Sequence, residues 1–229
     1  MTSSRQLTVL GAALVAAVFV APSLLATLVV GDYSSVGALR DGLPAAFAEH
    51  WRLGDGAVSH ALGRSADYWA TFHLVKAVAA ALLLAVLVTA LRRRRRRPPV
   101  LTAGLVLLTA LAVVLVIANL QGAVAPVSSL LSMLPADAVS AAADARGTDA
   151  FGGLVHDFAI YHAAVAVLAG GTTIILAVMG VRAWRRRGRP MAVVAFSAAL
   201  LLGVVALANV TTTADPEPAL VAFLDAASR

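Results

Sequence analysis

Five long apolar segments constrain the fold of this 229-residue chain more than any other feature. Each contains 20 to 24 residues with no acidic side chain in its interior, at residues 7–30, 69–91, 100–120, 158–181 and 191–210. A helix of about 20 apolar residues crosses a hydrocarbon core about 30 Å thick, whereas a crossing strand needs about 10 residues of alternating polarity. The sequence therefore predicts an all-α, polytopic membrane bundle of five transmembrane helices.

The composition agrees with this prediction. Only 13% of the residues are charged and the mean hydropathy is +0.88, whereas soluble domains carry about 25% charged residues. Soluble enzymes, secreted toxins and disordered regulators are thereby excluded. The chain has no cysteine, which excludes disulfides, thiol nucleophiles and cysteine-ligated metals, although histidines could still hold a haem.

The first apolar segment resembles a secretory signal peptide, because Arg5 precedes it and small residues surround Ala21. A signal peptide has an apolar region of about 7–15 residues. Here the apolar character continues through Leu28 to Val30. We therefore expect an uncleaved membrane anchor rather than a cleaved leader.

The charged residues predict the orientation. Twelve of the 18 basic residues precede the first apolar segment, follow the second or follow the fourth: Arg5, Arg92 to Arg97, Arg182, Arg185 to Arg187 and Arg189. All twelve acidic residues fall on the other side or border it. Basic residues mark cytoplasmic helix ends. We expect a plasma-membrane protein with a cytoplasmic amino terminus and an extracellular carboxyl terminus.

The clusters Arg92 to Arg97 and Arg185 to Arg187 are expected to attract anionic lipid headgroups of the bilayer. They are interpreted as tight cytoplasmic turns between neighbouring helices, so no nucleic-acid partner is expected. The abundance of alanine, valine and arginine is typical of bacterial coding at high GC content.

An internal repeat of about 90 residues is predicted, because a shift of 90 superimposes both arginine clusters, Asp67 on Asp157, and the chain's only two asparagines, Asn119 on Asn209. Each copy contains two crossings, so the copies are parallel. Copy one is residues 1–97, with helix 7–30, external segment 31–68, helix 69–91 and arginine turn 92–97. Copy two is residues 98–187, with helix 100–120, external segment 121–157, helix 158–181 and arginine turn 182–187. Residues 188–229 form a truncated third copy with helix 191–210 and an external tail.

The external segments carry apolar residues at helical spacing, Val36, Leu39 and Leu43 in the first and residues 127–134 in the second. Such a stripe is typical of a short amphipathic helix on the outer end of a bundle or against a partner. We expect Pro44 and Pro135 to interrupt these helices, with second helical stretches at 57–66 and 136–145, and a further stripe at 220–224.

His73 and His162 are the candidate cofactor ligands. Each follows an aromatic residue, Phe72 and Tyr161, near the external end of a helix that enters the membrane in the same direction. Two histidines at one depth could bind a b-type haem or a metal ion. The alternatives are anchoring at the membrane interface and proton or quinone chemistry.

Lys76 is a second candidate, because an ionisable residue inside a membrane segment is a functional candidate by default. Its amine could extend to the interface, reach Asp67 or Asp157, or line a substrate or ion pathway. Asn119 and Asn209 are interpreted as carboxyl-terminal helix caps, with a binding role as the alternative.

The sequence contains no nucleotide-binding motif or nucleophile elbow, and no carboxylate lies deep within a helix. The leading hypothesis is therefore a non-enzymatic membrane protein, an accessory, assembly or sensing subunit without a cofactor. Its partner is expected to be a second copy of itself or another membrane protein, bound through the external segments. Two alternatives are a haem-binding electron-transfer protein that uses His73 and His162, and a small transporter or channel with Lys76 in its pathway.

Overall fold

The computed structural model describes residues 4–54, 56–93 and 98–228, which contain helices and turns but no strand. Arginines 94–97 of the first predicted arginine turn lie outside the described residues. The helices are α1 (Ser4–Val30), α2 (Val36–Leu53), α3 (His60–Arg93), α4 (Pro99–Val124), α5 (Pro126–Leu130), the 3-10 helix η1 (Leu131–Met133), α6 (Ala136–Asp144), α7 (Asp149–Arg185), α8 (Arg189–Ala214) and α9 (Pro216–Ala227). Helices α1, α3, α4, α7 and α8 are long and apolar enough to cross a membrane. The prediction of an all-helical fold is confirmed for the described residues, and five helices of this length and composition fit a multi-pass membrane protein.

Two of these helices begin earlier than the apolar segments indicated. Helix α3 begins at His60 and α7 at Asp149, in each case nine residues before the predicted start. The Ser59 hydroxyl accepts a hydrogen bond from the Leu62 amide at 3.3 Å, and the Thr148 hydroxyl accepts one from the Phe151 amide at 3.2 Å. Such caps satisfy amides at a helix start, so polar turns extend both helices beyond their apolar cores.

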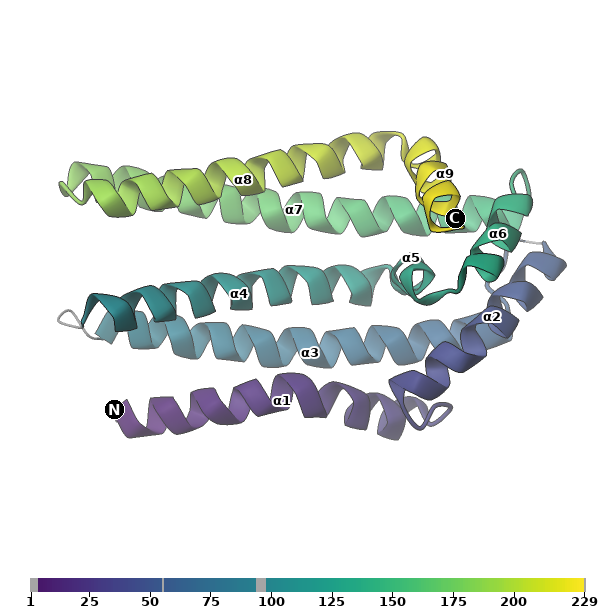
Figure 1. Ribbon diagram of the computed structural model, residues 1–229, viewed down its shortest axis with the longest axis horizontal. Coiled ribbons are helices and arrows are strands. Elements are labelled where there is room, and N and C mark those ends of the chain that lie inside the picture. Colours follow the sequence, from purple (N-terminus) through teal and green to yellow (C-terminus); the bar gives the residue numbers. More distant parts are fainter. Residues whose placement is uncertain (1–3, 55, 94–97, 229) are drawn as a thin grey trace. The chain divides into compact units, whose positions relative to one another are not determined.

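The described residues of 1–50 and 59–126 form one compact unit, here named unit 1. Helix α3 packs against both α1 and α4 (Figure 1). Small and branched side chains make its core: Val18 with Ala79 and Ala80, and Leu83 and Leu87 with Ala112. Small residues at helix contacts let backbones approach closely within a membrane, where packing rather than hydrophobic burial drives association.

The described residues of 51–58 and 127–228 form the second compact unit, named unit 2. Helices α7 and α8 pack along one another, and α9 contacts both α6 and α7 (Figure 1). An exposed ion pair between Arg146 and Asp225 connects the turn after α6 to α9. These two units are defined by packing, whereas the three predicted repeat copies are defined by similarity in sequence. The boundaries of the repeat copies therefore stay a prediction.

Short helices carry the predicted amphipathic stripes, and we name α2, α5, η1, α6 and α9 the cap helices. Most of the stripe residues are buried: Leu39, Leu43 and Phe47 in α2, and Leu220 and Leu224 in α9, each have an exposed fraction of 0%, whereas Phe223 of α9 is 37% exposed. The stripes therefore pack within the chain itself. Their opposite sides carry exposed charged residues.

Pro135 ends one helical stretch and precedes α6, as predicted, but Pro44 does not interrupt α2. Helix α2 continues through Pro44 to Leu53, so this prediction was wrong. The expected separate helix at 57–66 was also wrong, because those residues lead into α3 and form its first turns. The predicted stretch at 136–145 is confirmed as α6.

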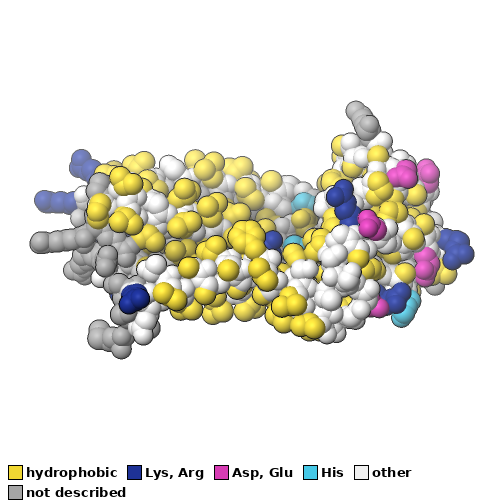
Figure 2. Space-filling model, turned by 60° about the horizontal axis from the view of Figure 1, so that its bottom comes forward, with side chains coloured by type: hydrophobic (Ala, Val, Ile, Leu, Met, Phe, Trp, Pro, Cys, Tyr) yellow, Lys and Arg dark blue, Asp and Glu magenta, His cyan; other side chains and the backbone are white. Residues whose placement is uncertain are grey.

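Large apolar side chains cover the outer surfaces of the membrane helices. Phe19, Val100 and Val167 are 74%, 83% and 73% exposed. On the face drawn in Figure 2, hydrophobic side chains follow the long helices, and the visible Asp and Glu side chains lie beyond them, near the cap helices. An exposed apolar surface of this extent is what helices in contact with lipid require.

Candidate functional site

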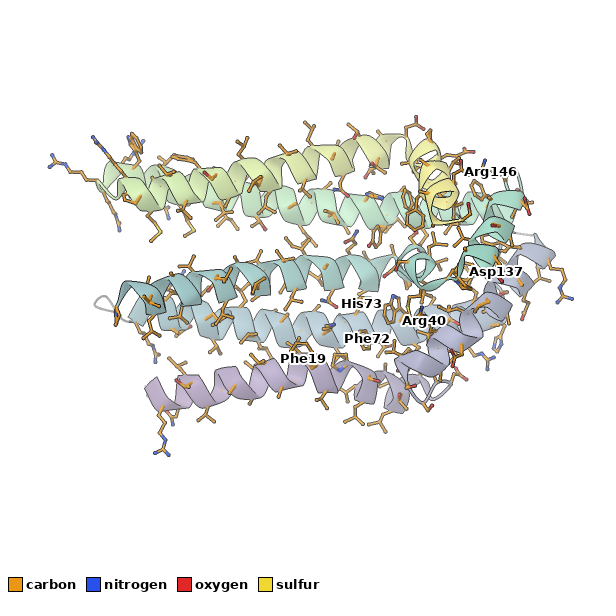
Figure 3. The ribbon with its side chains drawn as sticks, in the orientation of Figure 1. Phe19, Arg40, Phe72, His73, Asp137 and Arg146 are labelled. Atoms are coloured by element: carbon orange, nitrogen blue, oxygen red, sulfur yellow. The ribbon has the colours of Figure 1, made fainter. Side chains whose placement is uncertain are left out.

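His73 of α3, which is labelled in Figure 3, and Asn119 of α4 form a polar pair inside unit 1. The His73 Nδ1 atom lies 2.8 Å from the Asn119 Oδ1 atom. The Asn119 Nδ2 group donates to the Leu115 carbonyl at 2.7 Å, which fixes the orientation of the amide. Because Oδ1 can only accept, Nδ1 of His73 donates the hydrogen of the pair, and in the neutral imidazole Nε2 then carries the lone pair.

Unit 2 contains the same arrangement. The His162 Nδ1 atom of α7 lies 2.7 Å from the Asn209 Oδ1 atom of α8. The Asn209 Nδ2 group donates to the Val205 carbonyl, four residues earlier, at 2.8 Å. His162 therefore also donates through Nδ1. Each pair joins two membrane helices that are consecutive in the chain.

Aromatic residues surround the first histidine. The Trp69 ring lies 4.5 Å from the His73 ring, nearly perpendicular to it, and the Phe72 ring lies 5.6 Å away. These distances join ring centroids and are typical of favourable edge-to-face contacts. The aromatic residues come from the preceding turn of α3 and limit the orientations open to the imidazole.

The second histidine has an equivalent aromatic environment. Phe158 and Tyr161 lie 4.4 and 5.5 Å from the His162 ring. Phe158 corresponds to Trp69 and Tyr161 to Phe72 at a spacing of 89 residues, which also relates the two histidines and the caps Ser59 and Thr148. Helices α3 and α7 thus share a cap, an aromatic pair and a histidine in one register.

The two pairs differ in burial. Asn119 is only 4% exposed, and His73 Nε2 is buried without a hydrogen-bond partner in the described part of the chain. Gly122 lies against this ring, because a Cβ at that position would stand 2.7–2.9 Å from His73 Cδ2, Nε2 and Cε1. Asn209 is half-buried, and Thr212 occupies the position 90 residues after Gly122. The His73 pair is therefore the more enclosed of the two.

The interpretation of Asn119 and Asn209 as carboxyl-terminal caps was wrong. Helix α4 continues to Val124 and α8 to Ala214, five residues beyond each asparagine. Both amides bond to a carbonyl of their own helix and to a histidine of the neighbouring helix. Their role is to connect helices rather than to end them.

Lys76 extends toward an aromatic ring. Its Nζ atom lies 5.4 Å from the centroid of Phe72, a distance at which an ammonium is attracted to the ring face. An ion pair with Asp67, one of the alternatives for its amine, is absent from the described part of the chain, where Arg64 pairs with Asp32 and Arg146 with Asp225. A role for Lys76 in a pathway stays a prediction.

Asp157 has a partner that the sequence did not suggest. Its Oδ2 atom accepts a hydrogen bond from the Ser128 amide at 2.7 Å. Ser128 lies in α5, and amides in the first turn of a helix lack partners within the helix. Asp157 therefore attaches α5 to α7. Asp67 is exposed on α3 and has no equivalent contact, although a shift of 90 residues aligns the two carboxylates.

The structure thus brings His73 together with Asn119, and His162 together with Asn209. Binding of one haem by both histidines stays a prediction, because His73 and His162 belong to different units. Each ring does hold its Nδ1 hydrogen in a bond and leaves Nε2 as the atom that could ligate iron. In the comparisons, no known protein family, curated protein or solved structure matches the chain.

Proposed function

We propose that the protein is a non-enzymatic, multi-pass plasma-membrane protein that serves as an accessory, assembly or sensing subunit. It engages a second membrane protein, or another copy of itself, through the exposed side of its cap helices. The observation that carries this proposal is the use of both intramembrane histidines in helix packing. A histidine whose Nδ1 hydrogen is held by an asparagine of the neighbouring helix stabilises a helix pair, and each unit contains one such pair.

In each unit the cap helices supply a surface for a partner. Their exposed positions carry charged residues, Arg40 and Asp41 on α2, Asp137 on α6, and Glu217 and Asp225 on α9, next to the exposed apolar side chains Leu53 and Phe223. A charged surface supports specific association and sets which partners are rejected. It does not compete with lipid, because it lies outside the apolar lengths of the helices.

The proposal includes the predicted orientation and repeat. The amino terminus lies in the cytoplasm and the carboxyl terminus outside the cell, and a parallel repeat of about 90 residues underlies the two helix pairs. The shared register of Ser59 with Thr148 and of His73 with His162 supports this duplication. Under this orientation the cap helices face outward.

Site-specific photo-crosslinking in native membranes tests the proposal. A photoreactive residue replaces Arg40 on α2 or Ala222 on α9, both exposed cap positions, and the matched control replaces Leu200, which is 70% exposed on the apolar surface of α8. We expect both cap positions, and not Leu200, to capture one reproducible protein. A product of doubled mass identifies a second copy, and any other mass identifies a partner. Recovery of only the monomer from both cap positions would contradict the proposal.

A further inference from the structure

Unit 1 contains an apolar groove that the proposed function does not use. It has a volume of about 620 Å³ and lies between α1, α3 and α4. Leu83, Leu87 and Ala112 form its floor and are buried, at 8%, 8% and 1% exposed. Val15 of α1 and Leu108 of α4 form its walls and are 45% and 51% exposed. The groove is therefore open along its walls and closed at its base.

The groove covers the depth of one lipid leaflet. Along α1 its lining extends from Leu7 to Phe19, and Phe19 is labelled in Figure 3. Twelve residues of helix are about 18 Å long at 1.5 Å per residue. Half of a hydrocarbon core of about 30 Å is about 15 Å. An extended acyl chain of one leaflet therefore matches the groove in length as well as in polarity.

Arg93 lines one end of the groove, and two further arginines lie close to this end in the sequence. Arg93, in the last turn of α3, lines it together with Leu7 near the start of α1. Arg92 and Arg5 are exposed beside these two residues. Among the described residues of α1, α3 and α4, the only acidic one is Asp67, which precedes Arg93 by 26 residues, or about 39 Å of helix. This end of the groove therefore carries positive charge from two helices with no acidic side chain nearby.

We propose that this groove binds one acyl chain of an anionic phospholipid, whose phosphate lies against Arg5, Arg92 and Arg93. The inference goes beyond the proposed function. The walls lie at hydrocarbon depth, where water cannot fill the space, and a lipid chain satisfies them without a polar group. Guanidinium groups bind phosphate oxygens through paired hydrogen bonds, and basic clusters next to a membrane segment favour anionic over zwitterionic headgroups.

A helix from a second copy is the competing occupant. Copies in one membrane share one orientation, so a neighbouring copy would bring its own arginine-rich end to the same level as Arg92 and Arg93. Like charges at that level repel, whereas a phosphate is attracted. The charge at the end of the groove therefore favours a lipid over a second copy.

Photoreactive lipids test the proposal on the purified full-length protein in nanodiscs. Phosphatidylglycerol and phosphatidylcholine carry the same diazirine-labelled acyl chain, and mass spectrometry locates the crosslinks. We expect phosphatidylglycerol to label α1 and α4 peptides of the groove more strongly than phosphatidylcholine. Replacing Arg92 and Arg93 by Gln should lower this labelling about ten-fold, because each basic residue contributes to headgroup binding.

Matched variants separate the groove from the rest of the surface. Ala12→Trp places a large side chain on the wall of the groove, whereas Ala13→Trp places it at an exposed position of α1 that does not line the groove. We expect the first to remove the phosphatidylglycerol crosslinks and the second to leave them unchanged. Replacing Arg182 and Arg185, which are exposed in unit 2, should also leave them unchanged. Equal labelling of the groove by both lipids, or labelling by phosphatidylglycerol that Ala12→Trp leaves unchanged, would overturn the proposal.

Discussion

At the scale of single residues, His73 and Asn119 show how polar side chains are accommodated in an apolar bundle. A buried polar group costs free energy unless it is hydrogen-bonded. The Asn119 amide meets this condition twice, because it donates to Leu115 of its own helix and accepts from His73 of the neighbouring helix. One asparagine therefore allows one histidine to lie within unit 1 at a helix contact.

We predict measurable coupling between the two side chains of each pair. Hydrogen bonds between membrane helices contribute about 0.6 kcal/mol on average and up to about 1.7 kcal/mol. A double-mutant cycle with His73→Ala and Asn119→Ala should give about 1–2 kcal/mol, because Asn119 is 4% exposed. The matched cycle with His162→Ala and Asn209→Ala should give less. The free energy of unfolding in bicelles is the measurement.

The two cycles control one another, since both remove the same chemical groups from helix pairs of the same design. Coupling near zero in both would contradict a structural role for the histidines. Because Asn209 is half-buried, larger coupling in unit 2 would contradict the prediction that burial strengthens the hydrogen bond.

The sequence identified all four residues of these pairs but not their pairing. His73 and Asn119 are 46 residues apart, and no local periodicity relates positions on two different helices. The cap interpretation of Asn119 failed because hydropathy falls at Gln121 and Gly122, which resembles a helix end. The close approach of α4 to α3 at Gly122 explains that glycine better, and it depends on the packed structure.

At the scale of helices, hydropathy located all five membrane helices but not the starts of α3 and α7. A hydropathy pattern reports the apolar length and misses polar turns that continue the same helix. Ser59 and Thr148 are the signals that could have located both starts, because serine and threonine are preferred caps. Each lies 14 residues before its histidine, so the repeated spacing was also present in the sequence.

Pro44 and Pro135 show why a proline alone does not define a helix end. A proline inside a helix removes one backbone hydrogen bond and strains the preceding turn. In α2 the buried side chains Leu43 and Phe47 lie on both sides of Pro44, and packing holds the helix together across it. Pro135 instead precedes the first residue of α6, where a missing amide hydrogen costs little.

Helix α4 offers a direct test of close helix packing. We predict that Gly122→Ala lowers the free energy of unfolding by about 1–3 kcal/mol, because its Cβ would overlap the His73 ring and shift it away from Asn119. Gly104→Ala in the same helix is the control, since nothing lies within 4 Å of a Cβ there. That variant should be neutral or stabilising by up to about 1 kcal/mol, from helix propensity alone.

Unfolding in bicelles would measure the loss of stability, and the proton spectrum of the His73 imidazole would report the shift of the ring away from Asn119. If the two alanine variants had equal stability, the contact between Gly122 and His73 would not constrain the distance between α3 and α4. A loss of stability in Gly122→Ala that persists in a His73→Ala background would assign the cost to another neighbour.

At the scale of the whole molecule, charge segregation is what the sequence specifies most fully. In unit 1, α3 ends on Arg92 and Arg93, while Asp67 lies in its first turns. In unit 2, α7 begins at Asp149 and ends on Arg185. In each of these helices the acidic residues therefore lie at the end opposite the terminal arginines, although α3 also carries Arg64 at its acidic end, where it pairs with Asp32. The arrangement of the two cap surfaces depends on contacts between distant segments, which a charge pattern does not encode.

This segregation predicts the orientation in the membrane, and cysteine labelling can measure it. The natural chain has no cysteine, so Ser34→Cys, Arg186→Cys and Ser228→Cys each introduce a single thiol at an exposed or half-buried position of a turn or helix end. Because basic residues stay on the cytoplasmic side, an impermeant maleimide should label Ser34→Cys and Ser228→Cys in intact cells. Arg186→Cys should be labelled only after permeabilisation.

The three positions together test more than the direction of insertion. Between Ser34 and Ser228 the chain contains α3, α4, α7 and α8, an even number of crossings, so both must lie on one side if each helix spans the membrane. Arg186 lies between α7 and α8 and must lie on the opposite side. If only Arg186→Cys were labelled in intact cells, the orientation would be the reverse of the predicted one, but the four crossings would still hold. Labelling of Ser34→Cys without Ser228→Cys would require one of these helices not to cross, which would remove the basis for parallel copies.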